Sequence, residues 1–327
     1  MEMSRKKPYL KKIAILLCAS VAAATLPALE GDPSFAFQEI WGYLISGSES
    51  AIDASFPVSD IAYFAAGLNS FGTLVGVPDV RKVRPLGKRV HLVVAETGNQ
   101  ALTHFCLDPA YPVRDALVRD ITLAAVDFDG VQIDFEAVNA KDKEHFLAFL
   151  SRLKGSLGNR TLSVALVARW RDVNDAYDYG RISAIADRVI IMAYDEHWSS
   201  SGPGAIASLE WCRTISDYAQ RKIGAGKLVM ALPFYGRAWA DKNPAKAYAH
   251  AGISRIISEK ELSAGRLSDE SPFFEYQETV NVRVFFEDAR SLGSRLRLYS
   301  DALVGKVAFW RLGLEDAEIW KALRLVE

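Results

Sequence analysis

Two carboxyl side chains lie two residues apart in the segment 128–136, and this spacing suits acid–base chemistry. Apolar residues alternate there with Gln132, Asp134 and Glu136, which indicates a buried strand with these three polar side chains on one face. Buried polar groups are costly unless they are hydrogen-bonded or form a site. We expect repulsion between Asp134 and Glu136 to keep one of them protonated at neutral pH, as a general acid requires.

An edge strand with a solvated polar face is the alternative interpretation of the segment 128–136. Its other face carries aromatic and branched residues, and further apolar strands are predicted along the chain. Both observations favour a strand that is buried on two sides, as in a parallel sheet.

Eight apolar segments alternate with helical segments, and this order predicts a (β/α)₈ TIM barrel. Active sites of such barrels lie at the carboxyl ends of the strands, where the segment 128–136 ends. The expected strands cover residues 39–45, 60–66, 89–95, 130–135, 161–167, 188–194, 227–233 and 306–310. The expected helices cover residues 112–126, 141–157, 205–222, 287–296 and 314–325.

The pattern Asp129-Gly130-x-x-x-Asp134-x-Glu136 resembles the Asp-Gly-x-Asp-x-Asp-x-Glu signature of glycoside hydrolase family 18, the chitinase family. It departs from the signature at Gln132, which stands where the family usually has its first inner Asp. The third expected strand also departs, because its end lacks the usual small residues. Other strand ends resemble the family in order, namely Gly42-Tyr43, residues 60–69, Met192-x-Tyr194-Asp195, Tyr235-Gly236-Arg237 and Trp310.

The resemblance covers about residues 38–325 and implies roles for the residues that match. Glu136 is expected to be the general acid/base. Asp134 is expected to orient the substrate N-acetyl group and stabilise its developing charge, and Tyr194 to hydrogen-bond the same group. This substrate-assisted retention differs from the scheme that uses two enzyme carboxylates. Gln132 cannot titrate, and we expect its amide to donate to Asp134 and keep that carboxyl ionised.

The remaining matched residues are expected to bind sugar or to support the site. Each has a structural alternative, since Trp310 and Met192 also suit a core and Arg237 also suits an ion pair. Asp129 is expected to hold the start of its strand. The expected substrate contacts are Asp195, Trp310, Tyr43, Tyr235, Arg237 and Met192.

The resemblance also implies a small α+β insertion between the seventh and eighth strands. The segment 241–286 is longer than a strand–helix connection needs, and its end suggests a hairpin. A plain surface excursion is the alternative. Together these features predict a catalytic barrel over residues 29–327 that contains this insertion.

Residues 1–28 are expected to be a signal peptide. Five basic residues precede a short apolar run, and small residues follow it. The run is too short for a comfortable membrane span. Lipidation of Cys18 and an uncleaved anchor are the alternatives. Without this segment the net charge changes from −1 to −5, which argues against nucleic-acid binding.

The sequence thus predicts an exported, periplasmic or extracellular glycosidase, acting as a monomer. Its expected partner is a glycan with β-linked N-acetylglucosamine, either chitin, chitooligosaccharide or peptidoglycan. The alternative is a chitinase-like lectin that has lost catalysis, against which Glu136 is retained. Endo and exo action are both open. No cofactor or metal is expected, because the five His lack metal-ligand spacing and no P-loop or Gly-x-Ser-x-Gly motif is present.

Overall fold

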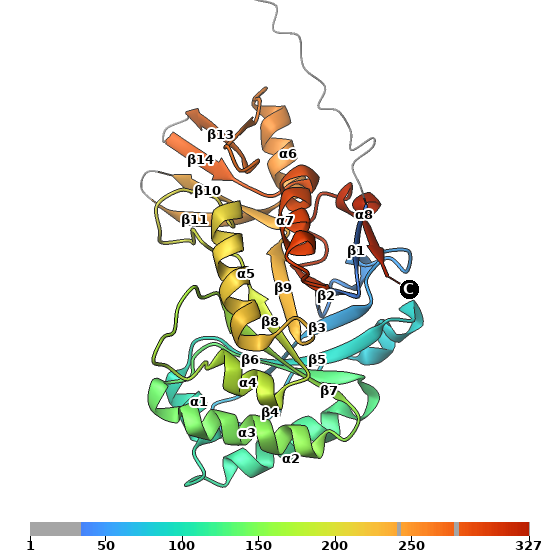
Figure 1. The fold of residues 1–327 in the computed structure, drawn as a ribbon, viewed down its shortest axis with the longest axis vertical. Coiled ribbons are helices and arrows are strands. Elements are labelled where there is room, and N and C mark those ends of the chain that lie inside the picture. The colour runs from blue at the N-terminus through green and yellow to red at the C-terminus, as the bar shows by residue number, and fades with distance from the viewer. Residues whose placement is uncertain (1–33, 241–242, 278–280, 327) are drawn as a thin grey trace, which may run out of the picture. The chain divides into compact units, whose positions relative to one another are not determined.

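The computed structural model describes residues 34–240, 243–277 and 281–326, which belong to one compact unit. The expected signal peptide, with Cys18, lies outside these residues. Eight parallel strands close into a barrel, because β2 pairs with both β15 and β3 (Figure 1). The predicted (β/α)₈ barrel is therefore confirmed. Its strands are β2 (Glu39–Ile45), β3 (Asp60–Leu68), β5 (Arg89–Glu96), β6 (Gly130–Phe135), β7 (Thr161–Val167), β8 (Arg188–Met192), β9 (Leu228–Pro233) and β15 (Lys306–Trp310).

Helices alternate with these strands, and side-chain caps set several of their starts. Asn99 and Asp178 each accept a backbone hydrogen bond at the start of a helix that the sequence pattern did not reveal. The helices are α1 (Gln100–Leu107), α2 (Val113–Ala124), α3 (Lys143–Ser156), α4 (Tyr179–Ile185), α5 (Leu209–Ile223), α6 (His250–Glu259), α7 (Ala289–Asp301) and α8 (Ile319–Ala322).

Two expected helices differ from those in the structure. The helix expected from residue 205 begins at Leu209, because the Ser208 hydroxyl accepts a hydrogen bond from the backbone of Trp211 and caps it. The helix expected over 314–325 is wrong for most of its length. There α8 is one turn long, and β16 (Leu323–Leu325) pairs in parallel with β1 (Phe35–Phe37).

A second sheet lies between β9 and β15 in the chain. Its five strands are antiparallel, and α6 packs against them through Ile253, which contacts Phe274, Val284 and Phe286 (Figure 1). A short strand, β4 (Leu74–Val75), pairs with β3 in the barrel sheet. The second sheet consists of β10 (Tyr235–Ala240), β11 (Asn243–Ala249), β12 (Gly265–Arg266), β13 (Pro272–Gln277) and β14 (Asn281–Phe285).

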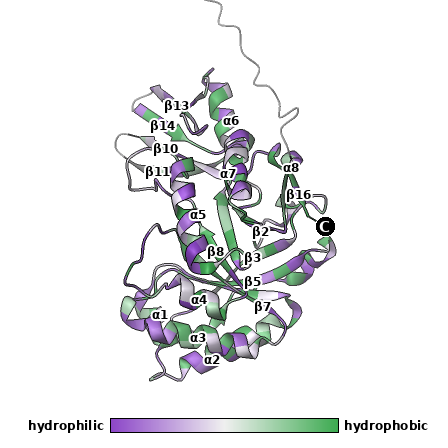
Figure 2. Ribbon diagram, viewed as in Figure 1, coloured by the Kyte–Doolittle hydropathy of each residue, from purple (hydrophilic) through white to green (hydrophobic). Residues whose placement is uncertain are grey.

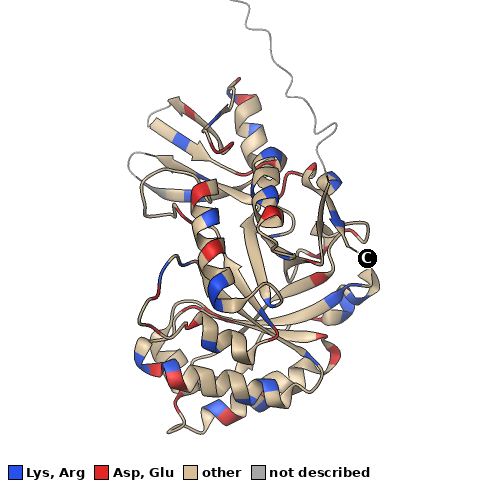
Figure 3. Ribbon diagram, viewed as in Figure 1, with Lys and Arg blue, Asp and Glu red and all other residues tan. Residues whose placement is uncertain are grey.

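The barrel interior is filled by apolar and aromatic side chains from several strands. Trp41, Tyr43, Ile190 and Val229 belong to one buried cluster. Strands β8 and β9 are mostly hydrophobic in colour in Figure 2, whereas Figure 3 shows many of the charged residues on the helices. This distribution is typical of parallel strands that are buried on both faces.

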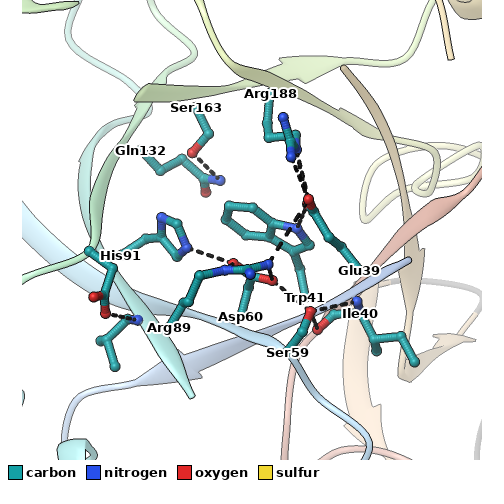
Figure 4. Close-up of polar contacts among 12 residues, drawn as sticks. Glu39, Ile40, Trp41, Ser59, Asp60, Arg89, His91, Gln132, Ser163 and Arg188 are labelled. Carbon is teal, nitrogen blue, oxygen red and sulfur yellow. Dashed lines mark hydrogen bonds and ion pairs between the residues drawn. The ribbon is translucent and has the colours of Figure 1, made fainter. Parts of the chain in front are cut away.

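Two buried carboxylates at the amino-terminal end of the barrel form ion pairs with partly exposed arginines (Figure 4). Arg188 donates to both oxygens of Glu39, at 2.5 to 3.1 Å. Arg89 donates to both oxygens of Asp60 at 2.6 and 2.7 Å, and His91 Nε2 lies 2.8 Å from the same carboxyl. Burial raises the pKa of Asp60, but the bonds from His91 and Arg89 outweigh it and leave the pKa below its ordinary value. The partners at this end compensate the cost of burying the two carboxylates, and the opposite end of the barrel is where active sites of this fold lie.

Candidate active site

Strand β6 separates two environments, as its alternating sequence predicts. On the outer face, Phe135 stacks on Phe146 and Phe149 of α3, with ring centroids 6.4 and 5.9 Å apart. On the inner face, the side chains of Gln132 and Asp134 are buried inside the barrel. Glu136, directly after the strand, is exposed at the barrel mouth. The strand therefore carries a row of polar groups from the barrel interior to its rim.

A pocket of about 1030 Å³ lies at the carboxyl ends of the barrel strands. Many of its lining residues come from strand ends or from the loops that follow them. The predicted residues that line it are Glu136, Asp134, Tyr194, Asp195, Trp310, Tyr43 and Met192. Four other predicted residues are not among those that line it, namely Tyr235, Arg237, Gln132 and Asp129.

Glu136 faces the pocket with its carboxyl open to solvent. The surrounding protein still removes water from it, and this partial burial raises its pKa above the ordinary value. The negative charge of Asp195 raises the pKa further. A carboxyl in such surroundings holds its proton to higher pH than a free glutamate, which suits a general acid.

Asp134 is the most strongly perturbed carboxyl in the pocket. Its side chain is 4% exposed, and its Oδ1 atom has no hydrogen-bond partner among the described residues. Burial, followed by the charge of Glu136, raises the pKa of Asp134 to about 7. At neutral pH this carboxyl is therefore close to half protonated, and a proton held there is available as a hydrogen-bond donor.

The expected bond from Gln132 to Asp134 is absent from the described contacts. Gln132 Nε2 instead donates to Ser163 Oγ on β7, at 3.3 Å, and its Oε1 has no partner (Figure 4). The expectation that Gln132 keeps Asp134 ionised is therefore wrong. Without a donor to compensate for burial, the neutral form of Asp134 is favoured.

Aromatic side chains form one side of the pocket. The ring of Trp310 lies 5.2 Å from Tyr43 and 5.0 Å from Phe64, between ring centroids. Burial raises the pKa of the Tyr43 and Tyr194 hydroxyls well above 10, so both stay protonated and can donate hydrogen bonds. The Tyr43 hydroxyl is buried beside Gln132, and a hydrogen bond with that side chain opposes part of the rise in the pKa of Tyr43.

Asp195 is held in place by the two expected substrate contacts that do not line the pocket. Arg237 donates to both of its oxygens, with the shortest contacts at 2.8 and 3.0 Å, and the Tyr235 hydroxyl also donates to it. Asp195 adopts a left-handed backbone conformation (φ 58°), which is costly for a residue other than glycine. Arg237 thus makes the ion pair that was the alternative interpretation.

Asp129 lies at the opposite end of β6, as expected for a residue that holds the strand start. Its Oδ2 accepts bonds from Arg84, at 2.6 Å, and from the backbone of Val90, at 2.8 Å. It thereby links the starts of β5 and β6. Glu96, at the end of β5, caps the following turn by accepting from the backbones of Gly98 and Asn99.

The sequence interpretation missed one wall of the pocket. Its residues follow β7 and β8 and include the first turn of α5. Trp170 and Trp198 are 55% and 51% exposed there, which is unusual for tryptophan. The signal available in the sequence was their position, since each follows the end of an expected strand within four residues. The missed lining residues of this wall are Val167 at the end of β7, Ala168, Trp170, Glu196, Trp198, Ser208, Glu210, Trp211 and Thr214, and two more lie elsewhere, Phe64 on β3 and Thr97 after β5.

Two further searches concern metals and membranes. No group of three or more His, Cys, Asp or Glu among residues 34–240, 243–277 and 281–326 is arranged to hold a metal ion. Within the same ranges, no helix is both long and apolar enough to cross a membrane.

Comparison with known proteins completes the description of the site. Glycosyl hydrolases family 18 matches residues 116–315. YvbX, an uncharacterized glycosylase of Bacillus subtilis (strain 168), is 28% identical over 62% of this chain and 63% of its own length. The cortical fragment-lytic enzyme of Bacillus cereus is 26% identical over 84% of this chain and 70% of its own.

A solved structure supports the same fold. The spore cortex-lytic enzyme SleL of Bacillus cereus superposes with a TM-score of 0.80 at 24% identity, covering 90% of this chain and 76% of that one. The chain spans about three fifths of the length of YvbX and of a second Bacillus subtilis relative. Because the family match covers more than half of the chain and includes β6 and its carboxyls, the protein belongs to glycoside hydrolase family 18, a family of glycosidases.

Proposed function

We propose that this protein hydrolyses β-linked N-acetylglucosamine glycans by substrate-assisted retaining catalysis, with Glu136 as general acid/base. One observation carries the proposal. The buried carboxyl of Asp134 on β6 and the exposed carboxyl of Glu136 directly after this strand line the same pocket, and the pKa of each is raised. Perturbed titratable groups in a cleft mark candidate catalytic sites.

In the proposed first step, Glu136 donates its proton to the glycosidic oxygen as the bond to the anomeric carbon breaks. The carbonyl oxygen of the substrate N-acetyl group bonds to the anomeric carbon and forms an oxazolinium ion. The leaving glycan departs with the proton from Glu136. In the second step Glu136 removes a proton from water, whose oxygen bonds to the anomeric carbon. The bond from that carbon to the acetyl oxygen breaks, which opens the oxazolinium ring and restores the N-acetyl group. The net reaction adds one water across the glycosidic bond, with retention.

Asp134 and Tyr194 are proposed to position the N-acetyl group. The unpartnered Oδ1 of Asp134 suits the amide N–H of the acetamido group, and ionised Asp134 stabilises positive charge on the oxazolinium ring. The protonated hydroxyl of Tyr194 suits its carbonyl oxygen. Trp310, beside Tyr43 and Phe64, supplies a flat apolar surface for the sugar ring.

We propose peptidoglycan or a soluble oligosaccharide, rather than crystalline chitin, as the natural substrate. Two relatives support this choice, because their names describe lysis of cortical fragments and of spore cortex. We also propose export through residues 1–28, since peptidoglycan and chitin both lie outside the cytoplasm. Its test is amino-terminal sequencing of the protein recovered from culture medium and from the cell envelope.

The function is tested with a fluorogenic N,N′-diacetylchitobioside and with purified peptidoglycan. Hydrolysis by the wild type that is lost in Glu136→Gln, while Glu144→Gln on the outer surface keeps it, would support the acid/base role. The amide keeps the size of the side chain and removes its proton. Absence of turnover in the wild type, with binding of N-acetylglucosamine oligomers intact, would instead establish the lectin.

A further inference from the structure

The pocket wall formed by Glu196, Trp198, Glu210 and Trp211, hereafter the α5 wall, combines negative charge with aromatic rings. All four residues line the pocket. Trp198 lies in the loop after β8, and Glu210 and Trp211 lie in the first turn of α5. None of the lining residues in the described part of the chain is Lys or Arg. The α5 wall therefore faces any bound glycan with carboxylates that no pocket cation offsets.

The two carboxylates of the α5 wall differ in how they are held. Glu196 Oε2 accepts a bond of 2.7 Å from the backbone of Ser208, which leaves its second oxygen available. No side-chain contact is found for the Glu210 carboxylate among the described residues. A helix amino terminus favours an acidic residue, but this does not require that residue to line a pocket beside a tryptophan. In contrast, Asp195 is neutralised by Arg237.

One deeply buried group indicates independently that the pocket takes a polar ligand. Asp134 Oδ1 has no partner among the described residues, although the side chain is only 4% exposed. Asp134 lines the same pocket as the α5 wall. Unsatisfied buried polar groups are rare, so a ligand that hydrogen-bonds to this oxygen is expected.

We propose that the α5 wall binds a sugar unit that carries a protonated free amino group, next to the N-acetylated unit at the cleaved bond. This inference rests on the proposed function and names its substrate as a partially N-deacetylated glycan. Carboxylates accept strong hydrogen bonds from ammonium groups, and tryptophan faces attract both sugar rings and cations. The unit at the cleaved bond needs its acetyl group for the reaction, so the amine occupies a neighbouring unit.

The same wall disfavours anionic units. A muramic acid unit with a free carboxyl group places like charges together, which lowers affinity and slows association, whereas a muramic acid unit whose carboxyl is amide-linked to a peptide carries no such charge. The glycan portion that binds along the α5 wall is therefore cationic or neutral. This selection by charge is separate from the general preference for N-acetylglucosamine, which does not involve charge.

The test uses partially N-acetylated chitooligosaccharides, with mass-spectrometric sequencing of the products. We expect every new reducing end to be N-acetylglucosamine, and glucosamine to be enriched in one adjacent unit above its frequency in the substrate. Glu210→Gln and Glu196→Gln should each reduce this enrichment roughly twofold to fivefold, as loss of one exposed ion pair does. The amide of Glu196→Gln still accepts the bond from Ser208.

The matched control is Asp217→Asn, an equal charge change on the exposed face of α5, seven residues beyond Glu210 and outside the pocket lining. Its enrichment should equal that of the wild type, and added salt should lower the wild-type enrichment. The inference would be overturned if cleavage occurred after N-acetylglucosamine but the adjacent unit were random, and if Glu210→Gln gave the same products. That result would leave the proposed function standing. If nothing is cleaved the proposed function fails, and equal calorimetric affinity of the wild type and Glu210→Gln for a partially N-acetylated tetramer would overturn the inference as well.

Discussion

Arg237 donates to both carboxylate oxygens of Asp195, and through this ion pair a residue outside the pocket lining controls a charge inside it. Asp195 in turn raises the pKa of Glu136. The left-handed backbone of Asp195 is costly, and the ion pair helps to offset that cost. The pKa of Glu136 thus depends on the ion pair between Asp195 and Arg237, although Arg237 itself does not line the pocket.

Replacing Arg237 should therefore change the pH profile as well as the rate. In Arg237→Met the charge of Asp195 is no longer neutralised, so the pKa of Glu136 rises and the basic limb of kcat/KM moves to higher pH. Loss of hydrogen bonds to a charged group costs about 1.5–3 kcal/mol, which corresponds to about a 10- to 100-fold lower kcat/KM. Arg237→Lys should recover part of it. Arg255→Met, on the exposed side of α6, is the control, and an unshifted profile would contradict the role of Arg237.

Asp134 should make the protein less stable as pH rises. Its pKa is 3.8 ordinarily and about 7 when folded, so the folded state binds the proton more tightly. The free energy of unfolding therefore falls from about pH 4 to pH 7 and then levels off, by about 4 kcal/mol at most from this group. Asp134→Asn cannot ionise, so it should become more stable than the wild type near pH 8 but not near pH 4. Urea unfolding at both pH values tests this, and parallel pH dependences of the two proteins would exclude it.

Replacing Gln132 with aspartate should make the free energy of unfolding depend more steeply on pH. In Gln132→Asp two buried carboxyls lie one pleat apart, and they cannot both ionise at low cost. The variant should lose more stability than the wild type between pH 5 and pH 8, and its kcat profile should gain a second ionisation. Gln132→Asn is the neutral control and should keep the wild-type slope. Equal slopes in all three proteins would show that the two carboxyls are not coupled.

Arg295 should be essential for stability because it is fully buried against a buried glutamate. It donates to the carbonyls of Ala207 and Ser291 and to the Ser271 hydroxyl at 2.6–2.8 Å, and its Nη2 lies 3.3 Å from Glu287. Burial raises the pKa of Glu287 to about 7 even beside Arg295, so Arg295→Met leaves an uncompensated charge only above that pH, where it should cost about 3–5 kcal/mol of unfolding free energy.

The double variant Arg295→Met/Glu287→Leu removes both charges and keeps apolar side chains in their place, so it tests the charge effect apart from the packing. It should recover most of the loss in urea unfolding, because no unpaired charge then remains buried. A double variant as unstable as Arg295→Met alone would mean that the hydrogen bonds to Ala207 and Ser271 matter more than the ion pair. Ala207 precedes α5, so in that case KM should rise as well.

The barrel itself could be predicted because its signal is local and repeated. Alternating apolar residues define β6, and the same order of strands and helices recurs along the chain. The helix expected over 314–325 failed for the opposite reason. Leucines 323 and 325 also suit a helix, and their pairing with β1, nearly 290 residues earlier, decides for a strand.

From the sequence alone we could predict candidate residues for the chemistry. The spacing of Asp134 and Glu136 puts them on one face of a strand, and the barrel order brings Tyr194 and Trp310 to the same end. Their partners and their protonation follow from the tertiary structure. Arg237 turns to Asp195, Gln132 turns to Ser163, and Asp134 is left without a donor. Burial and long-range contacts determine these pKa values, and neither can be read from local spacing.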